Sequence, residues 1–173
     1  PGGIHEPRPP FRESPAMTTP GLAIEAKLAD LGLSLPPTAP SRALFLPGKV
    51  TGNLLFLSGQ ICEWEGVPKY FGPIGTGFDV LVGQSAAQMC ALNLLFSIRA
   101  ITGSLERVSL IVRVGGFVAA DPGYPDGPQI VDGASQLFID LWGDAGRHAR
   151  TAVNVASLPA NAMVEVDAVV ELT

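Results

Sequence analysis

The sequence is short of cysteine. Cys62 and Cys90 are its two cysteines, and both lie among apolar residues without CxxC spacing or a companion histidine. Structural zinc sites and disulfide frameworks require several cysteines or histidines at short spacings, so neither is predicted. We expect two buried free thiols in a reducing compartment, which favours a cytoplasmic location.

The sequence also lacks the marks of membrane, secreted and nucleic-acid-binding proteins. It has no run of about 18 uncharged apolar residues, and its start lacks the basic-then-apolar layout of a signal peptide. Lys and Arg number 11 against 16 Asp and Glu, which gives a formal net charge of -5. Because nucleic-acid affinity comes largely from basic residues that neutralise phosphates, the composition argues against a nucleic-acid partner.

Motifs of nucleotide, metal and serine-hydrolase chemistry are missing as well. The Gly-rich pieces match neither GxGxxG nor GxxxxGK[ST] in the required context, and there is no HExxH and no Ser/His/Asp elbow. The sequence therefore predicts no metal and no nucleotide cofactor.

What the sequence does contain is enough apolar residues for one well-buried core, at 47% of 173 residues. Residues 1–16 are rich in Pro and Gly and precede Met17, which resembles a natural start, so we interpret them as an upstream segment outside the folded domain. Residues 17–41 are predicted to form a short helix, over about 20–31, and a Pro-rich linker. Residues 42–173 are predicted to form a single domain.

Apolar periodicity and turn residues predict the elements of this domain. They are strands over 42–46 and 53–62 joined as a hairpin, a further short strand around 61–63, a helix over about 80–102, a strand over 107–120 with a Gly pair read as a bulge, a helix from about 130 to 143, and two final strands within 150–172. The Gly-rich loop 65–77 is long enough to be a functional lid.

This order of elements predicts an α+β domain with one sheet and two helices packed on one face. The second face of such a sheet must also be covered. Since no other part of the sequence can cover it, we expect the chain to form an oligomer.

The last two predicted strands carry two charged residues of interest. Arg150 opens the first strand, and Glu165 lies within the second. Because alternate residues of a strand share a face, we expect the valines of both strands to face the helices and the charges to point away from them. Direct pairing of these strands would set Asn154 opposite Glu165 and leave Arg150 about 13 Å away. Cooperation between the charges therefore requires non-adjacent strands or two chains. From periodicity alone, solvated side chains or a structural ion pair remain alternatives, and His148 is interpreted as a surface residue.

Four segments together resemble one known family. They are "TGNLLFLSGQ" (51–60), "QSAAQMCALNLLFSI" (84–98), "RVSLIVRVGGFVA" (107–119) and "HARTAVNVASLPANAMVEVDAVVE" (148–171). They are similar to the reactive intermediate deaminases, the RidA/YjgF group, also labelled endoribonuclease L-PSP, and the similarity covers about residues 43–171. The resemblance implies a chorismate-mutase-like fold and a homotrimer with three sites in the clefts between subunits.

The resemblance also implies roles for three residues. Arg150 would hold the carboxylate of a small imine or enamine such as 2-aminoacrylate or 2-iminobutyrate, as the arginine fork suits a carboxylate. Glu165 would position the attacking water as general base and then acid while ammonia leaves. Ser58 would line the pocket. No metal or organic cofactor is required, because a protonated imine is already electrophilic.

Two positions depart from the family pattern. Leu46 stands where the family has a tyrosine, and Ala152 stands where it has a thiol or hydroxyl residue two after the arginine. Both make the pocket wall more apolar, which keeps open a non-catalytic trimer that binds or senses a small carboxylate. An endoribonuclease, suggested by the family label, is the weakest alternative because the chain is acidic and has no basic stripe.

Overall fold

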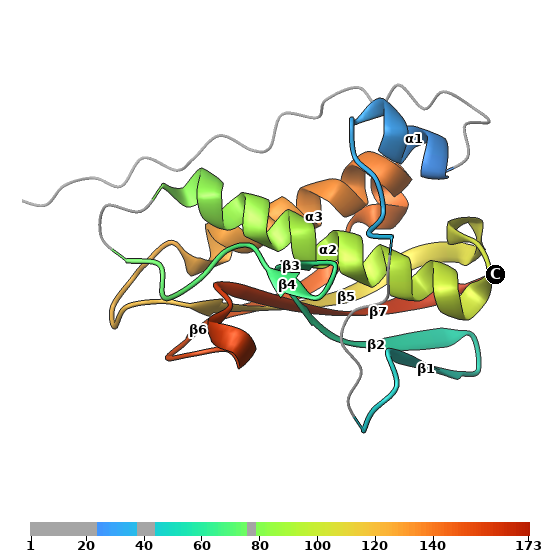
Figure 1. Cartoon of the computed structure of the whole chain (residues 1–173). Coiled ribbons are helices and arrows are strands. Elements are labelled where there is room, and N and C mark those ends of the chain that lie inside the picture. Colours follow the sequence, from blue (N-terminus) through green and yellow to red (C-terminus); the bar gives the residue numbers. More distant parts are fainter. Residues whose placement is uncertain (1–23, 38–43, 76–78) are drawn as a thin grey trace, which may run out of the picture.

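The structure is a computed structural model, and it describes residues 24–37, 44–75 and 79–173. Residues 1–23 and 38–41 of the predicted N-terminal segments lie outside them. A five-stranded sheet of order β1-β2-β7-β5-β6 carries the long helices α2 and α3 on one face (Figure 1). This confirms the predicted α+β architecture with one sheet and two helices on one face.

The elements follow one another in the predicted order. They are α1 (Ile24–Asp30), β1 (Gly48–Thr51), β2 (Leu54–Ile61), the small hairpin β3 (Glu63–Trp64) and β4 (Val67–Pro68), α2 (Val80–Thr102), β5 (Val108–Ala119), α3 (Gly127–Trp142), β6 (Ala149–Val155) and β7 (Val164–Leu172), with single 3₁₀ turns at Leu105–Arg107, Gly143–Gly146 and Pro159–Asn161. The predicted helix over 20–31 corresponds to α1, although residues 20–23 are not described.

Helix α2 has the bounds that its sequence predicts. Asp79 caps it by accepting a hydrogen bond from the Leu81 backbone N–H at 2.9 Å, and Gly103 ends it in the left-handed conformation at φ 84°. By length and composition this helix could cross a membrane, but 61% of its most apolar window is buried within the fold. Cys90 of α2 and Cys62 are both free and fully buried, as predicted.

The first strand of the N-terminal hairpin lies further along the chain than predicted. Its first strand is β1, and residues 44–46, the described part of the predicted strand 42–46, form no strand and are exposed. Thr51 pairs with Leu54, so Gly52 and Asn53 make a two-residue turn, with Gly52 at φ 57°. Such a tight turn requires strand residues directly before it, which moves the strand to 48–51.

The glycine pair of β5 allows close packing and makes no bulge, contrary to the prediction. A Cβ on Gly116 would lie 2.5 Å from Val131 of α3, and a Cβ on Gly115 would lie 2.5 Å from the Asp167 carboxylate. A bulge lies instead in β2, where the three-residue step from Leu57 to Gln60 faces the two-residue step from Ala168 to Val166. Two register shifts in β5 lie earlier, between residues 108 and 113.

The last two strands do not form a hairpin. β5 lies between them, parallel to β6 and antiparallel to β7, and β6 is the edge strand. Residues of β5 and β7 that face the helices are buried, among them Val114, Val118, Val164 and Val166. The opposite face of the sheet carries exposed Phe56, Leu110 and Val153, so it is open in the single chain.

The described part of loop 65–77 is tied to the domain by backbone hydrogen bonds. Ile74 donates to the Ala119 carbonyl at 2.8 Å, and Gly72 donates to the Asn161 carbonyl at 2.9 Å. Ile74 also pairs with Ala120, the residue directly after β5. Residues 76–78 are not described. The suggested lid motion therefore finds no support in this part of the loop.

Candidate functional site

Arg150 lies on the helix side of the sheet, so the predicted orientation of β6 is wrong. Arg150 pairs with Val114 and Ala152 pairs with Gly116 in the parallel register of β5 and β6. Paired residues share a face, and Val114 is buried beneath the helices. The face of β6 with small residues packs under α3 because the helix approaches closely at Gly116, whereas Val153 is 42% exposed on the open face.

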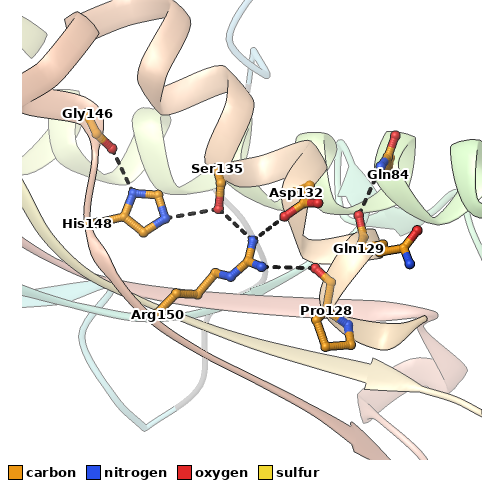
Figure 2. Close-up of polar contacts among 8 residues, drawn as sticks. All are labelled: Gln84, Pro128, Gln129, Asp132, Ser135, Gly146, His148 and Arg150. Atoms are coloured by element: carbon orange, nitrogen blue, oxygen red, sulfur yellow. Dashed lines mark hydrogen bonds and ion pairs between the residues drawn. The ribbon is translucent and has the colours of Figure 1, made fainter. Parts of the chain in front are cut away.

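Arg150 is held against α3 by three hydrogen bonds (Figure 2). Its Nη1 donates to Asp132 Oδ1 at 2.6 Å and to Ser135 Oγ at 3.1 Å, and its Nη2 donates to the Pro128 carbonyl at 3.2 Å. A guanidinium has five N–H donors. Nη1 is therefore fully used, while Nε makes no hydrogen bond to any described residue and one Nη2 hydrogen remains. These two donors can receive a carboxylate.

His148 extends this network and is not the surface residue that was predicted. Its Nδ1 lies 2.7 Å from the Gly146 carbonyl and its Nε2 lies 3.0 Å from Ser135 Oγ. Since a carbonyl only accepts, we assign the proton to Nδ1, so Ser135 donates to Nε2 and accepts from Arg150. Burial lowers the pKa of His148, and the Arg150 charge lowers it further against the opposing effect of the Gly146 carbonyl.

Glu165 lies on the other, open face of the sheet. It pairs with Phe117 of β5 and Ile61 of β2, and its carboxylate reaches over Gly59, where a Cβ would lie 2.0 Å from Oε1. Burial raises the pKa of Glu165, and the neighbouring Asp167 carboxylate raises it further. Such a carboxyl is closer to the working pH of a general base than an exposed glutamate is.

Ser58 of the β2 bulge directly precedes Gly59 and contacts Leu46 in the segment before β1. Ser58 Oγ donates to the Leu46 carbonyl at 2.6 Å, and the Leu46 side chain is 65% exposed. Phe45, which no sequence pattern indicated, is 61% exposed next to it. The close approach of the Glu165 carboxylate to Gly59 could not be predicted either, because "SGQ" is a common strand ending.

The predicted site residues thus form two groups on opposite faces of one chain. Arg150 and Ala152 lie on the helix side at the β6 edge, whereas Glu165 lies on the open side over Gly59, which follows Ser58 in the chain. The sheet separates the two groups, so one chain cannot bring Arg150 and Glu165 to the same small molecule. Within the described ranges, no group of three or more His, Cys, Asp or Glu residues could hold a metal ion.

A mixed five-stranded sheet with two long helices on one face defines the chorismate-mutase-like class of α+β folds. The chain belongs to the family described as "YjgF/chorismate_mutase-like, putative endoribonuclease", whose profile matches residues 25–172.

Relatives of this chain are similar over most of their length. Protein TCP17 of Trypanosoma cruzi is 37% identical over 150 residues, which are 86% of this chain and 94% of that protein. The crystal structure of Atu1372 from Agrobacterium tumefaciens, a protein of unknown function, is 40% identical with a TM-score of 0.80, covering 87% of this chain and 92% of that one. A Shewanella oneidensis structure with the same endoribonuclease description is 30% identical with a TM-score of 0.82, covering 87% and 100%.

Gly59 offers a direct test of where the Glu165 carboxylate must lie. In Gly59→Ala, the new methyl group would occupy the place of Oε1 and displace the flexible end of Glu165, without backbone strain. A misplacement of this size in a catalytic group costs about 10²-fold in rate. For the general-base role that the family resemblance implies for Glu165, we expect a similar loss in imine hydrolysis, with a melting temperature within a few degrees of wild type. Unchanged activity would show that this position of the carboxylate is not required.

Proposed function

We propose that the protein is an imine/enamine deaminase that hydrolyses small carboxylated reactive intermediates to keto acids and ammonia, at sites formed between the subunits of a homotrimer. One observation carries the proposal: Arg150 and Glu165, the two residues that this chemistry needs, lie on opposite faces of the sheet. The Arg150 face of one subunit and the Glu165 face of the next can form one cleft, which a single chain cannot.

The side chains suit each step of the hydrolysis. The Nε and remaining Nη2 donors of Arg150 would bind the substrate carboxylate, and the three contacts to α3 would hold the guanidinium in place. Glu165 would accept a proton as water adds to the imine carbon, and would return it to nitrogen. The C–N bond then breaks and ammonia leaves, while Glu165 takes the proton of the hydroxyl group and passes it to solvent, so that the carbonyl of the keto acid forms.

The open face of the sheet supports the trimer. Phe56, Leu110 and Val153, from three different strands, are exposed on it, and apolar side chains that a single chain leaves exposed on a sheet face favour an interaction surface. A second copy packed there would bury them and place its Arg150 edge near Glu165. Light scattering at micromolar concentration should give the mass of three 18.0-kDa chains; the mass of one chain would contradict the proposal.

The activity is tested on 2-iminobutyrate generated in situ. Purified protein should accelerate the release of the keto acid above the spontaneous rate, and heat-treated protein should not. Release at the spontaneous rate with correctly folded, trimeric protein would refute the proposed deaminase.

The raised pKa of Glu165 predicts the pH dependence of this activity. As a base, Glu165 must be ionised, so kcat/KM should fall with decreasing pH, and the fall should begin at a higher pH than for an exposed glutamate. Asp167→Asn removes the neighbouring negative charge and leaves Arg113, now 3.0 Å from Asp167, unpaired nearby. Both changes favour the ionised form of Glu165, so the acid limb should move to lower pH. An unmoved limb would show that another group titrates.

A non-catalytic trimer that binds a small carboxylate is the second candidate. It is favoured by Ala152, which offers no proton donor beside Arg150, and by the exposed Leu46 in place of a polar residue. A keto acid that raises the melting temperature, without turnover of any imine, would identify this function.

A further inference from the structure

Asp132 places a negative charge beside Arg150. A binding site for simple carboxylates does not need this charge. Its Oδ1 accepts the 2.6 Å hydrogen bond from Arg150, while Oδ2 makes none with the described residues. The Asp132 side chain is 53% exposed, compared with 25% for Arg150. The carboxylate therefore contacts the guanidinium on one side and remains open to a ligand on the other.

Asp132 also borders a groove between α2 and α3. The groove has a volume of about 510 Å³ and is lined mainly by Leu81, Gln84, Ser85, Gln88, Asp132 and Gln136. Gly133 lies at its floor, where a Cβ would come 2.0 Å from the Gln84 carbonyl, so the helices touch there. The groove thus begins at the partner of Arg150 and runs along the outside of the helical layer.

Glutamine and serine side chains supply the neutral polar groups of the groove. Gln84 Nε2 donates to the Gln129 carbonyl at 2.9 Å, and Gln136 Nε2 donates to Asp140 Oδ1 at 2.7 Å. Each amide nitrogen keeps one further N–H, so these groups can both donate and accept, whereas Asp132 Oδ2 can only accept. Asp132 is the charged residue among those that line the groove. A complementary ligand therefore carries a positive charge beside Asp132.

The charges around Arg150 also favour a ligand with a cationic group. A carboxylate bound to the free donors of Arg150 would lie close to the Asp132 carboxylate, and like charges repel. A substrate with one carboxylate and no cation would meet this repulsion uncompensated. A substrate with an additional cationic group would place it against Asp132 and form an attraction instead.

We propose that the substrate is a 2-imino acid whose side chain ends in an ammonium or guanidinium group, with its carboxylate on Arg150 and its cationic end on Asp132 and in the groove. This inference rests on the proposed deaminase function and names its substrate class. Asp132 acts in it as the residue that determines specificity.

The test compares imino acids of different side-chain charge. Imines generated in situ by an amino-acid oxidase from arginine, leucine and glutamate would be presented to the trimer, and kcat/KM measured for each. We expect the arginine-derived imine to be preferred over the leucine-derived one by at least about tenfold, and the glutamate-derived imine to be the poorest. In Asp132→Asn, whose Oδ1 can still accept the hydrogen bond from Arg150, kcat/KM for the arginine-derived imine should fall to that for the leucine-derived imine, so that the preference disappears, chiefly through KM.

Asp144→Asn is the matched control, because Asp144 is 96% exposed, follows α3 and does not contact Arg150. It removes the same charge and should keep the wild-type preference. Equal kcat/KM for the arginine- and leucine-derived imines would overturn the inference. So would an Asp132→Asn variant that loses activity equally on all three, since Asp132 would then only orient Arg150.

Binding of the keto-acid products separates failure of this inference from failure of the proposed function. Calorimetry would compare 5-guanidino-2-oxopentanoate with 4-methyl-2-oxopentanoate on wild type and Asp132→Asn. Tighter binding of the guanidino acid, lost in the variant, supports the role of Asp132 even if no imine is hydrolysed. Equal affinities would refute that role even in an active deaminase.

Discussion

Replacing Arg150 with alanine is expected to lower kcat/KM for carboxylated imines by at least about 100-fold, because two hydrogen bonds to a charged group contribute about 1.5–3 kcal/mol each. Three contacts to α3 hold the guanidinium so that Nε and one Nη2 hydrogen remain for the substrate. The loss should appear in steady-state kinetics on 2-iminobutyrate and on the arginine-derived imine.

Two further variants separate the charge of Arg150 from its shape. Arg150→Lys keeps the charge but loses the planar fork, so its kcat/KM should lie between those of wild type and the alanine variant. Arg147→Ala removes an arginine that pairs with Asp144 at the surface and should behave like wild type. If Arg150→Ala keeps wild-type kcat/KM while folded, then Arg150 does not bind the substrate.

Replacing Glu165 with glutamine is expected to lower kcat by about 10²–10⁴-fold, the usual contribution of a general base. Glutamine has nearly the same shape as glutamate and can lie over Gly59 in the same way, so the binding of the keto-acid product should change little. The half-buried carboxyl has a raised pKa, so removing its charge should not lower the melting temperature.

The control for Glu165 lies on the same strand and the same face. Glu171 of β7 accepts a hydrogen bond from Asn53 at 2.6 Å, far along the strand from Gly59. Glu171→Gln should therefore keep wild-type kcat. A Glu165→Gln variant with wild-type kcat would show that the attacking water is activated by a different group.

The sequence predicted the elements whose signals are local. The cap at Asp79 and the glycine at 103 define α2 to the residue, and the alternating valines of β7 place Glu165 correctly on the open face. Ser58 and Leu46 contact each other, and their roles in a pocket stay predictions. These features depend on neighbours close in the chain, or on one strand that is buried on one side.

The orientation of β6 could not be read from alternation, because it depends on a contact distant in sequence. Gly116 of β5 lets α3 approach the sheet, and Ala152 beside it leaves the same space on β6, so the side with small residues faces the helix. Val153 and Val155 of β6 then face outward, where a single chain leaves Val153 exposed and Val155 partly buried. Arg150 consequently meets Asp132, whose importance no local pattern indicated.

The central claim is that one site combines Arg150 of one subunit with Glu165 of another, and mixed trimers test it most directly. Arg150→Ala and Glu165→Gln chains would be co-expressed with different tags and purified through both, so that every trimer contains both variants. In a cyclic trimer, each mixed assembly then holds one interface with both native residues, and activity should recover to about one third of wild type. Activity no higher than that of the separate inactive variants, in verified mixed trimers, would contradict the shared site.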